Sequence, residues 1–109
     1  AHGQIVNVPL ASGGTGAQAR EVWQGICAQV LDWRPQLILV SAGFDAHADD
    51  PLASLMWREH DFAAITKMIC DTAAACSAPV VSALEGGYDL AALGRSARAH
   101  VEVLKETAA

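Results

Sequence analysis

Acidic and histidine side chains gather in the stretch SAGFDAHADDPL, which directly follows the apolar run LILV. It contains Asp45, His47, Asp49 and Asp50. Carboxylates held this close repel one another, and a bound cation relieves that repulsion. Carboxylate and imidazole groups also bind Zn²⁺, although a zinc site needs three protein ligands and an open position. The stretch therefore predicts either a metal site or carboxylates that cap the next turn and pair with surface cations.

A second candidate stretch is LEGGYDL, residues 84–90, which holds the only tyrosine of the chain, Tyr88. The Gly86-Gly87 pair lets the backbone approach a ligand closely. A phenol beside such a pair can donate its hydrogen to an oxyanion that develops during a reaction. The alternative is a ring that packs on the domain with its hydroxyl in water. Both interpretations stay open from this loop alone.

A third loop, ASGGTGAQA (residues 11–19), is rich in glycine and precedes a predicted helix. Such loops can bind an anion at a helix N-terminus. The phosphate-binding pattern fails, because Gly16 is followed by Ala17 and Gln18 instead of Lys and Ser or Thr. The dinucleotide pattern lacks its third glycine. The loop therefore predicts a simple tight turn, with anion binding as the alternative.

These loops follow strands in three consecutive strand-then-helix units. The pattern predicts an α/β fold of three βα units with parallel strands, in one domain over residues 1–109. The carboxyl ends of such strands meet at one edge of the sheet, so the loops are expected to lie together. The continuous apolar run in the second strand predicts cover on both faces. The predicted strands span 4–10, 36–43 and 79–84, and the predicted helices span 17–33, 59–75 and a segment capped by Asp89. Apolar spacing predicts that the second helix turns Phe62, Ile65, Ile69 and Ala73 inward, and that the third carries Leu90, Leu93, Ala97, Val101 and Leu104 on one side.

Composition narrows the classes of partner and compartment. The chain is 52% hydrophobic and carries a net charge of −5, so no basic surface is expected to bind nucleic acid. No apolar run approaches the length of a membrane span. Cys27, Cys70 and Cys76 form no CxxC pair, which predicts reduced thiols in a cytoplasmic protein. The apolar composition also suggests a surface that a partner covers.

The segments NVPL, LILVSAGFDAHADDPL and LEGGYDL, in this order, resemble the C-terminal third of the zinc-dependent deacetylase superfamily. That superfamily includes histone deacetylases, acetylpolyamine amidohydrolases and acetoin-utilisation proteins. GFDAH and EGGY are similar to its class II and bacterial branch. The resemblance implies the C-terminal part of the arginase/deacetylase fold, a Zn²⁺ cofactor and hydrolysis of acetyl-lysine or acetylpolyamine amides.

The resemblance also implies a role for each matching residue. Asp45 corresponds to a zinc ligand, and Tyr88 corresponds to the catalytic tyrosine that donates a hydrogen bond to the polarised carbonyl. Gly86 and Gly87 match glycines that line the acyl-lysine tunnel, and Leu52 matches an apolar residue of its wall. Zinc would polarise the amide carbonyl and activate water, and a general base would still be needed.

The sequence also departs from the family pattern. It lacks the His-His acid–base pair and the Asp-x-His motif with the other zinc ligands. His47 aligns with a later motif and is not assigned as a ligand, and Ala17 stands where many relatives carry an acid. Activity of this chain alone is therefore not expected.

The family's sheet order raises a further expectation. It separates the first of these strands from the other two, so exposed edges predict a homo-oligomer or a preceding portion. One alternative is a non-catalytic module that oligomerises or binds a partner. The other is a flavodoxin-like protein that binds phosphate through SGGTG.

Overall fold

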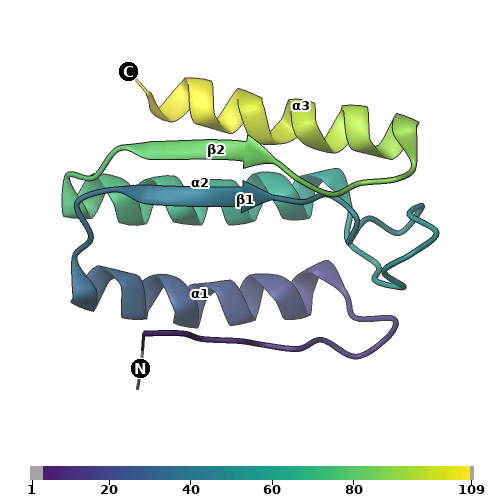
Figure 1. Cartoon of the computed structure of the whole chain (residues 1–109), viewed down its shortest axis with the longest axis horizontal. Coiled ribbons are helices and arrows are strands. Elements are labelled where there is room, and N and C mark those ends of the chain that lie inside the picture. The colour runs from purple at the N-terminus through teal and green to yellow at the C-terminus, as the bar shows by residue number, and fades with distance from the viewer. Residues whose placement is uncertain (1–3, 109) are drawn as a thin grey trace.

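In a computed structural model of the chain, which describes residues 4–108, three helices pack against a sheet of two parallel strands (Figure 1). The strands pair in register from Ile38 opposite Val80 to Ala42 opposite Leu84. The α/β class with parallel strands is therefore confirmed. The elements are α1 (Gly16–Trp33), β1 (Ile38–Ala42), α2 (Glu59–Cys76), β2 (Val80–Leu84) and α3 (Leu90–Thr107).

The helix ends follow from local hydrogen bonding. Thr15 caps α1, and its side chain and that of Gln18 each accept a backbone N–H of the other residue. Asp89 caps α3 as predicted, because its carboxylate accepts the N–H of Ala92 at 3.0 Å. α1 stops at Arg34, directly before a proline, where the α conformation is disfavoured.

The central helix α2 contacts both α1 and α3 and carries more buried side chains than any other element of the described residues. Its predicted inward residues, Phe62, Ile65, Ile69 and Ala73, are all buried. Ile65 and Ile69 join Ala19 of α1 in one apolar cluster, and Phe62 belongs to a second cluster toward α3. The second cluster joins Phe62 to Phe44, whose rings meet edge to face with centroids 5.1 Å apart. Because Phe44 precedes Asp45, this cluster anchors the loop that holds the candidate site.

The helices lie on one side of the sheet, and the other side is uncovered among residues 4–108. Ile38 and Val40 of β1 pack toward α1 and α2. Leu39 and Val81 point the opposite way by strand alternation and are 71% and 55% exposed. The prediction that the second strand is covered on both faces is therefore wrong for this chain.

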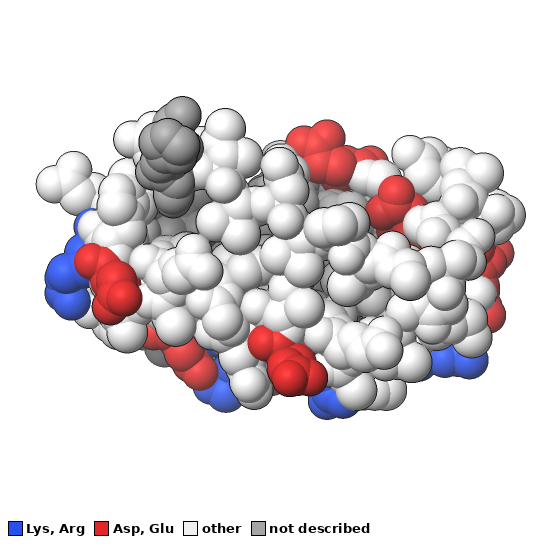
Figure 2. All heavy atoms as spheres, turned by 90° about the horizontal axis from the view of Figure 1, so that it is seen from below, with Lys and Arg blue, Asp and Glu red and all other residues white. Residues whose placement is uncertain are grey.

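The first predicted strand, residues 4–10, does not join the sheet. The segment is extended and runs beside α1, and Ile5 and Val8 are exposed (Figure 1). Seen from below, this face shows a broad uncharged strip between charged side chains at its margins (Figure 2). Extended backbone becomes a strand only beside a partner strand, and α1 lies there instead. Of the three predicted strands, the chain therefore forms two.

The inward face of α3 agrees only in part with the predicted one. Leu93 and Ala97 pack against the cluster that contains Phe44. Leu90 and Val101 do not, and they are 81% and 49% exposed. The buried residues include Ser96 and His100 instead. No helix in residues 4–108 combines the length and apolar content that a membrane crossing requires.

Gly16 and Gly25 of α1 provide a matched test of this packing. A Cβ at Gly16 would overlap the buried Asp61 carboxylate, whereas a Cβ at Gly25 meets nothing within 4 Å. Gly16→Ala is expected to lower the free energy of unfolding by about 1–3 kcal/mol. Gly25→Ala is expected to raise it by about 0.5–1 kcal/mol, because alanine favours a helix interior. Urea unfolding measures both, and effects of equal sign would contradict the packing.

Candidate active site

The three loops predicted to share one edge do lie together, beyond the carboxyl ends of β1 and β2 (Figure 1). The loop after β1 is in the middle and is hydrogen-bonded to both others. On one side the N–H of Gly13 donates to the Ser54 carbonyl at 2.6 Å. On the other side the N–H of Phe44 donates to the Gly86 carbonyl at 2.9 Å. The backbone therefore fixes the three loops as one unit.

Asp45 lies in this unit with its carboxylate against two glycines. An ideal Cβ on Gly86 would be 2.9 Å from Asp45 Oδ2, and one on Gly43 would be 3.1 Å from Oδ1. The side chain is half-buried. Among residues 4–108 its carboxylate takes part in no hydrogen bond or ion pair. A carboxylate without a partner, held close to backbone, is suited to bind an external cation.

Tyr88 follows Gly86 and Gly87 at the same edge. Gly87 has φ of +134°, and a Cβ there would be 2.8 Å from a Leu93 methyl carbon, so both backbone and space require glycine. The Tyr88 residue is 56% exposed. Its phenol is thus open to solvent, beside the glycine pair that adjoins Asp45.

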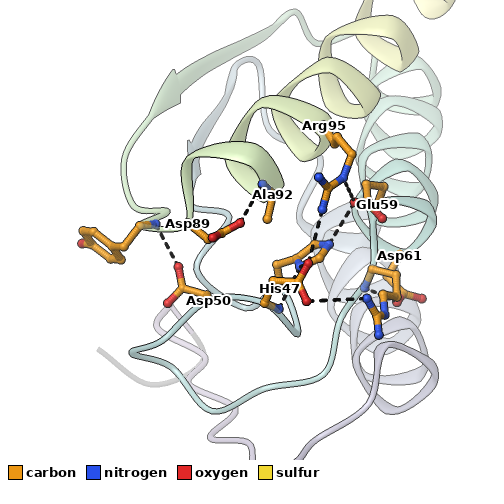
Figure 3. Close-up of polar contacts among 10 residues, drawn as sticks. His47, Asp50, Glu59, Asp61, Asp89, Ala92 and Arg95 are labelled. Atoms are coloured by element: carbon orange, nitrogen blue, oxygen red, sulfur yellow. Dashed lines mark hydrogen bonds and ion pairs between the residues drawn. The ribbon is translucent and has the colours of Figure 1, made fainter.

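Asp50 links the middle loop to the loop of Tyr88. Its Oδ1 accepts the N–H of Leu52 at 2.9 Å. Its Oδ2 accepts the N–H of Tyr88 at 2.8 Å (Figure 3). Burial by itself raises the pKa of the Asp50 carboxyl. The backbone N–H groups stabilise its charged form more strongly, so the pKa lies below its usual value. Asp50 is therefore a buried acceptor rather than a free ligand.

Leu52 lies on the outer side of the same loop. It is 66% exposed, and its backbone N–H is fixed by Asp50. An exposed apolar side chain at this edge is available to contact a substrate.

His47 lies inside the protein and is 0% exposed. Its Nδ1 accepts the N–H of Asp49 at 3.0 Å, so the hydrogen of the neutral ring lies on Nε2. That nitrogen donates to Glu59 Oε1 at 3.0 Å (Figure 3). His47 therefore holds the loop onto α2 and is not a second ligand beside Asp45.

Glu59 connects His47 to α3. The Arg95 guanidinium donates to Glu59 Oε1 at 2.7 Å and lowers the pKa of the carboxyl from 4.5 to about 2. The hydrogen bond from His47 acts in the same direction. Arg95 also reaches Asp49 at 3.3 Å. The middle loop is thus tied to both helices that flank it.

This ion pair predicts a dependence of stability on acid. The pKa of Glu59 is lower in the folded chain than in the unfolded one, so its contribution is complete above pH 4.5. It is lost as the pH falls from 4.5 toward about 2. The advantage of wild type over Glu59→Gln in free energy of unfolding is therefore expected to shrink across this interval. Urea unfolding at several pH values measures it, and a constant difference would contradict the coupling.

Residues 4–108 do not form a complete metal site. No three histidine, cysteine, aspartate or glutamate side chains among them converge on one point. Asp45 fits the role of one ligand, and the buried, hydrogen-bonded His47 does not. A catalytic zinc ion would need further ligands from outside these residues.

The glycine-rich loop forms a turn, as predicted, and the protein's own carboxylate occupies the N-terminus of α1. Asp61 is 3% exposed and lies against Gly16. It also accepts the N–H of Arg58 at 2.8 Å (Figure 3). Its carboxylate pairs with Arg20 at 3.4 Å. A negative charge is stabilised at a helix N-terminus, so the structure offers no open anion site there.

The architecture and this loop edge define an α/β protein with a candidate site at the carboxyl ends of its parallel strands, and comparison with known proteins identifies its family. Residues 1–104 match the family described as Histone deacetylase domain. The chain belongs to the histone deacetylase domain family. Type-2 histone deacetylase 1 of Dictyostelium discoideum is 39% identical over 105 residues, which cover 95% of this chain and 7% of that protein. Histone deacetylase 18 of Arabidopsis thaliana is 40% identical over 103 residues, covering 93% and 15% respectively.

Solved structures share the fold. The HDA15 HD domain superposes with a TM-score of 0.84 and 32% identity, covering 94% of this chain and 29% of that one. An acetylpolyamine aminohydrolase from Burkholderia pseudomallei superposes with a TM-score of 0.79 and 26% identity, covering 90% of this chain and 28% of that one. The chain therefore spans less than one third of each of these proteins.

Proposed function

We propose that this chain supplies one wall of the active site of a zinc-dependent amidohydrolase that removes acetyl groups from amines. Acetylated lysine side chains and acetylated polyamines are the substrate class. The observation that carries the proposal is the partnerless Asp45 carboxylate against Gly86, two residues before an exposed Tyr88. Membership of the deacetylase family supports it.

Each residue has a distinct role in this proposal. Asp45 holds the metal as one of several ligands, and a bound zinc ion supplies polarisation of the amide carbonyl and activation of water. The Tyr88 hydroxyl donates a hydrogen bond to the carbonyl oxygen as negative charge develops on it. Gly86 and Gly87 leave room for a narrow acyl chain, and Leu52 contacts its apolar part. The general base and the remaining ligands come from outside residues 4–108.

The test is hydrolysis of an acetyl-lysine peptide by the polypeptide that carries these 109 residues. We expect activity that disappears when a chelator removes the metal and returns when Zn²⁺ is added. An acetylated polyamine assayed in parallel assigns the substrate within the class. Metal-loaded protein that hydrolyses neither substrate would contradict the proposal.

A second candidate is a non-catalytic module that binds another copy of itself or another protein. The observation in its favour is the uncovered side of the sheet, where Leu39 and Val81 are exposed. Large apolar side chains side by side on a surface favour association. Light scattering measures association, and the hydrolysis assay above measures activity. This candidate predicts association without hydrolysis.

A further inference from the structure

We infer that Asp50 is the positioning residue of Tyr88, holding the tyrosine backbone so that its phenol stays at the site edge. This inference rests on the proposed function and adds a residue to it. Asp50 does not touch the substrate in this account. It acts only through the Tyr88 N–H, which it accepts at 2.8 Å.

The exposure of Tyr88 is the first reason. At 56% exposure, packing against neighbours does little to fix the direction of the phenol. Its direction then depends on its own backbone. That backbone follows Gly87 with φ of +134°, a conformation that glycine adopts easily and that gives the loop little intrinsic stiffness. A hydrogen bond to a buried carboxylate compensates for this freedom.

The second reason is that Asp50 is itself held firmly. It is 8% exposed, and its N–H donates to the His47 carbonyl at 3.0 Å. The following Pro51 restricts the backbone of Asp50 further. His47 is fixed to Glu59 of α2, so a continuous series of contacts runs from α2 to Tyr88. The rigid part of the fold thereby sets the position of the exposed phenol.

The third reason is the bidentate use of the carboxylate. Asp50 accepts the N–H of Leu52 with one oxygen and that of Tyr88 with the other. An asparagine has the same shape but only one acceptor oxygen and a donating amide in place of the second. Asp50→Asn is therefore expected to keep one of the two bonds and to loosen the loop without removing side-chain volume.

A double-mutant cycle tests the inference on the polypeptide that carries this chain. Asp50→Asn is expected to lower kcat for acetyl-lysine peptide hydrolysis about 10- to 100-fold, because a small displacement of a catalytic group is costly. KM is expected to change little, since the oxyanion develops only in the transition state. In a Tyr88→Phe background the same substitution is expected to change kcat less than about twofold, because residues that act as one unit are not additive. Asp71→Asn, the same charge change on the exposed surface of α2, is the control and should leave kcat near wild type.

The outcomes separate this inference from the proposed function. Suppose that Tyr88→Phe lowers kcat, but Asp50→Asn lowers kcat by the same factor in the wild-type and the Tyr88→Phe backgrounds. Asp50 then has only a structural role, and the inference is wrong. If Tyr88→Phe leaves kcat unchanged, the proposed function fails and the inference fails with it. An Asp50→Asn protein with wild-type kcat also overturns the inference.

A second measurement covers the case in which Asp50→Asn does not fold. In the wild-type chain, NMR is expected to show the amide protons of Leu52 and Tyr88 shifting along one common curve as the Asp50 carboxyl takes up its proton. Two unrelated curves, or a Tyr88 amide that exchanges with solvent as fast as an unfolded one, would overturn the inference.

Discussion

Tyr88→Phe is expected to lower kcat for amide hydrolysis about 100- to 1000-fold, the typical loss when one oxyanion donor is removed. The substitution removes only the hydroxyl. Within residues 4–108 that hydroxyl makes no hydrogen bond, and the residue is 56% exposed. The free energy of unfolding is therefore expected to stay near wild type. Steady-state kinetics with an acetyl-lysine peptide, together with urea unfolding, measure both quantities.

The matched control is Trp33→Phe, another substitution of an exposed aromatic by phenylalanine. Trp33 is 76% exposed at the far end of α1, away from the loop edge. The kcat of the Trp33→Phe protein is expected to equal that of wild type. A Tyr88→Phe protein that behaves like this control would remove the tyrosine from the mechanism.

Asp45→Asn is expected to lower kcat more than 100-fold. Removing a group that only hydrogen-bonds to a metal ligand typically costs about 10- to 100-fold, and removing the ligand's own charge should cost more. The substitution keeps the size of the side chain and removes the negative charge that a cation needs. Because no group in residues 4–108 bonds to this carboxylate, the midpoint of thermal unfolding without metal should not fall. Kinetics and calorimetry of metal-free protein measure these effects.

The control for Asp45 is Asp71→Asn, which removes an equal charge. Asp71 lies on the exposed surface of α2, and within residues 4–108 it pairs only with Lys67; such surface pairs contribute little to stability. Its activity is expected to match wild type. If Asp45→Asn instead destabilises the metal-free protein and retains activity, Asp45 is a capping residue, the alternative that the sequence left open.

The sequence predicted most of the local structure because its signals are local. The bounds of the helices depend on capping groups such as Thr15 and Asp89 and on the proline after Arg34, all visible in the residue order. The inward face of α2 follows from its apolar spacing. The shared loop edge follows from the parallel arrangement of strands.

What sequence reasoning missed depends on contacts between distant segments. The segment at residues 4–10 has the composition of a strand, but strand formation needs a neighbour that no local pattern reveals. His100 is buried, and its Nδ1 and Nε2 meet Thr66 at 2.8 Å and Ser82 at 2.7 Å. Burial lowers the pKa of this imidazole. The apolar pattern placed the neighbouring Val101 on the inward face of α3, but His100 is buried there instead.

In the acidic loop, too, the local turn could be predicted from the sequence and the contacts with distant residues could not. Its acidic side chains were interpreted either as part of a metal site or as carboxylates that cap the next turn and pair with surface cations, and only Asp45 remains without a partner among residues 4–108. His47 and Asp49 interact with Glu59 and Arg95, and Asp50 interacts with Tyr88. The Asp-Pro dipeptide signals a local turn, which is the one hint of Asp50's position. Its bond to Tyr88 spans 38 residues and has no local signal.

The most direct test of the central claim is the zinc content of the polypeptide that carries these residues, measured by atomic emission after dialysis. The account predicts about one zinc ion per active site, bound by Asp45 together with ligands from outside residues 4–108. Asp45→Asn should lose that zinc while Asp71→Asn retains it. Zinc bound equally by wild type and Asp45→Asn would show that Asp45 is not a ligand and would contradict the account.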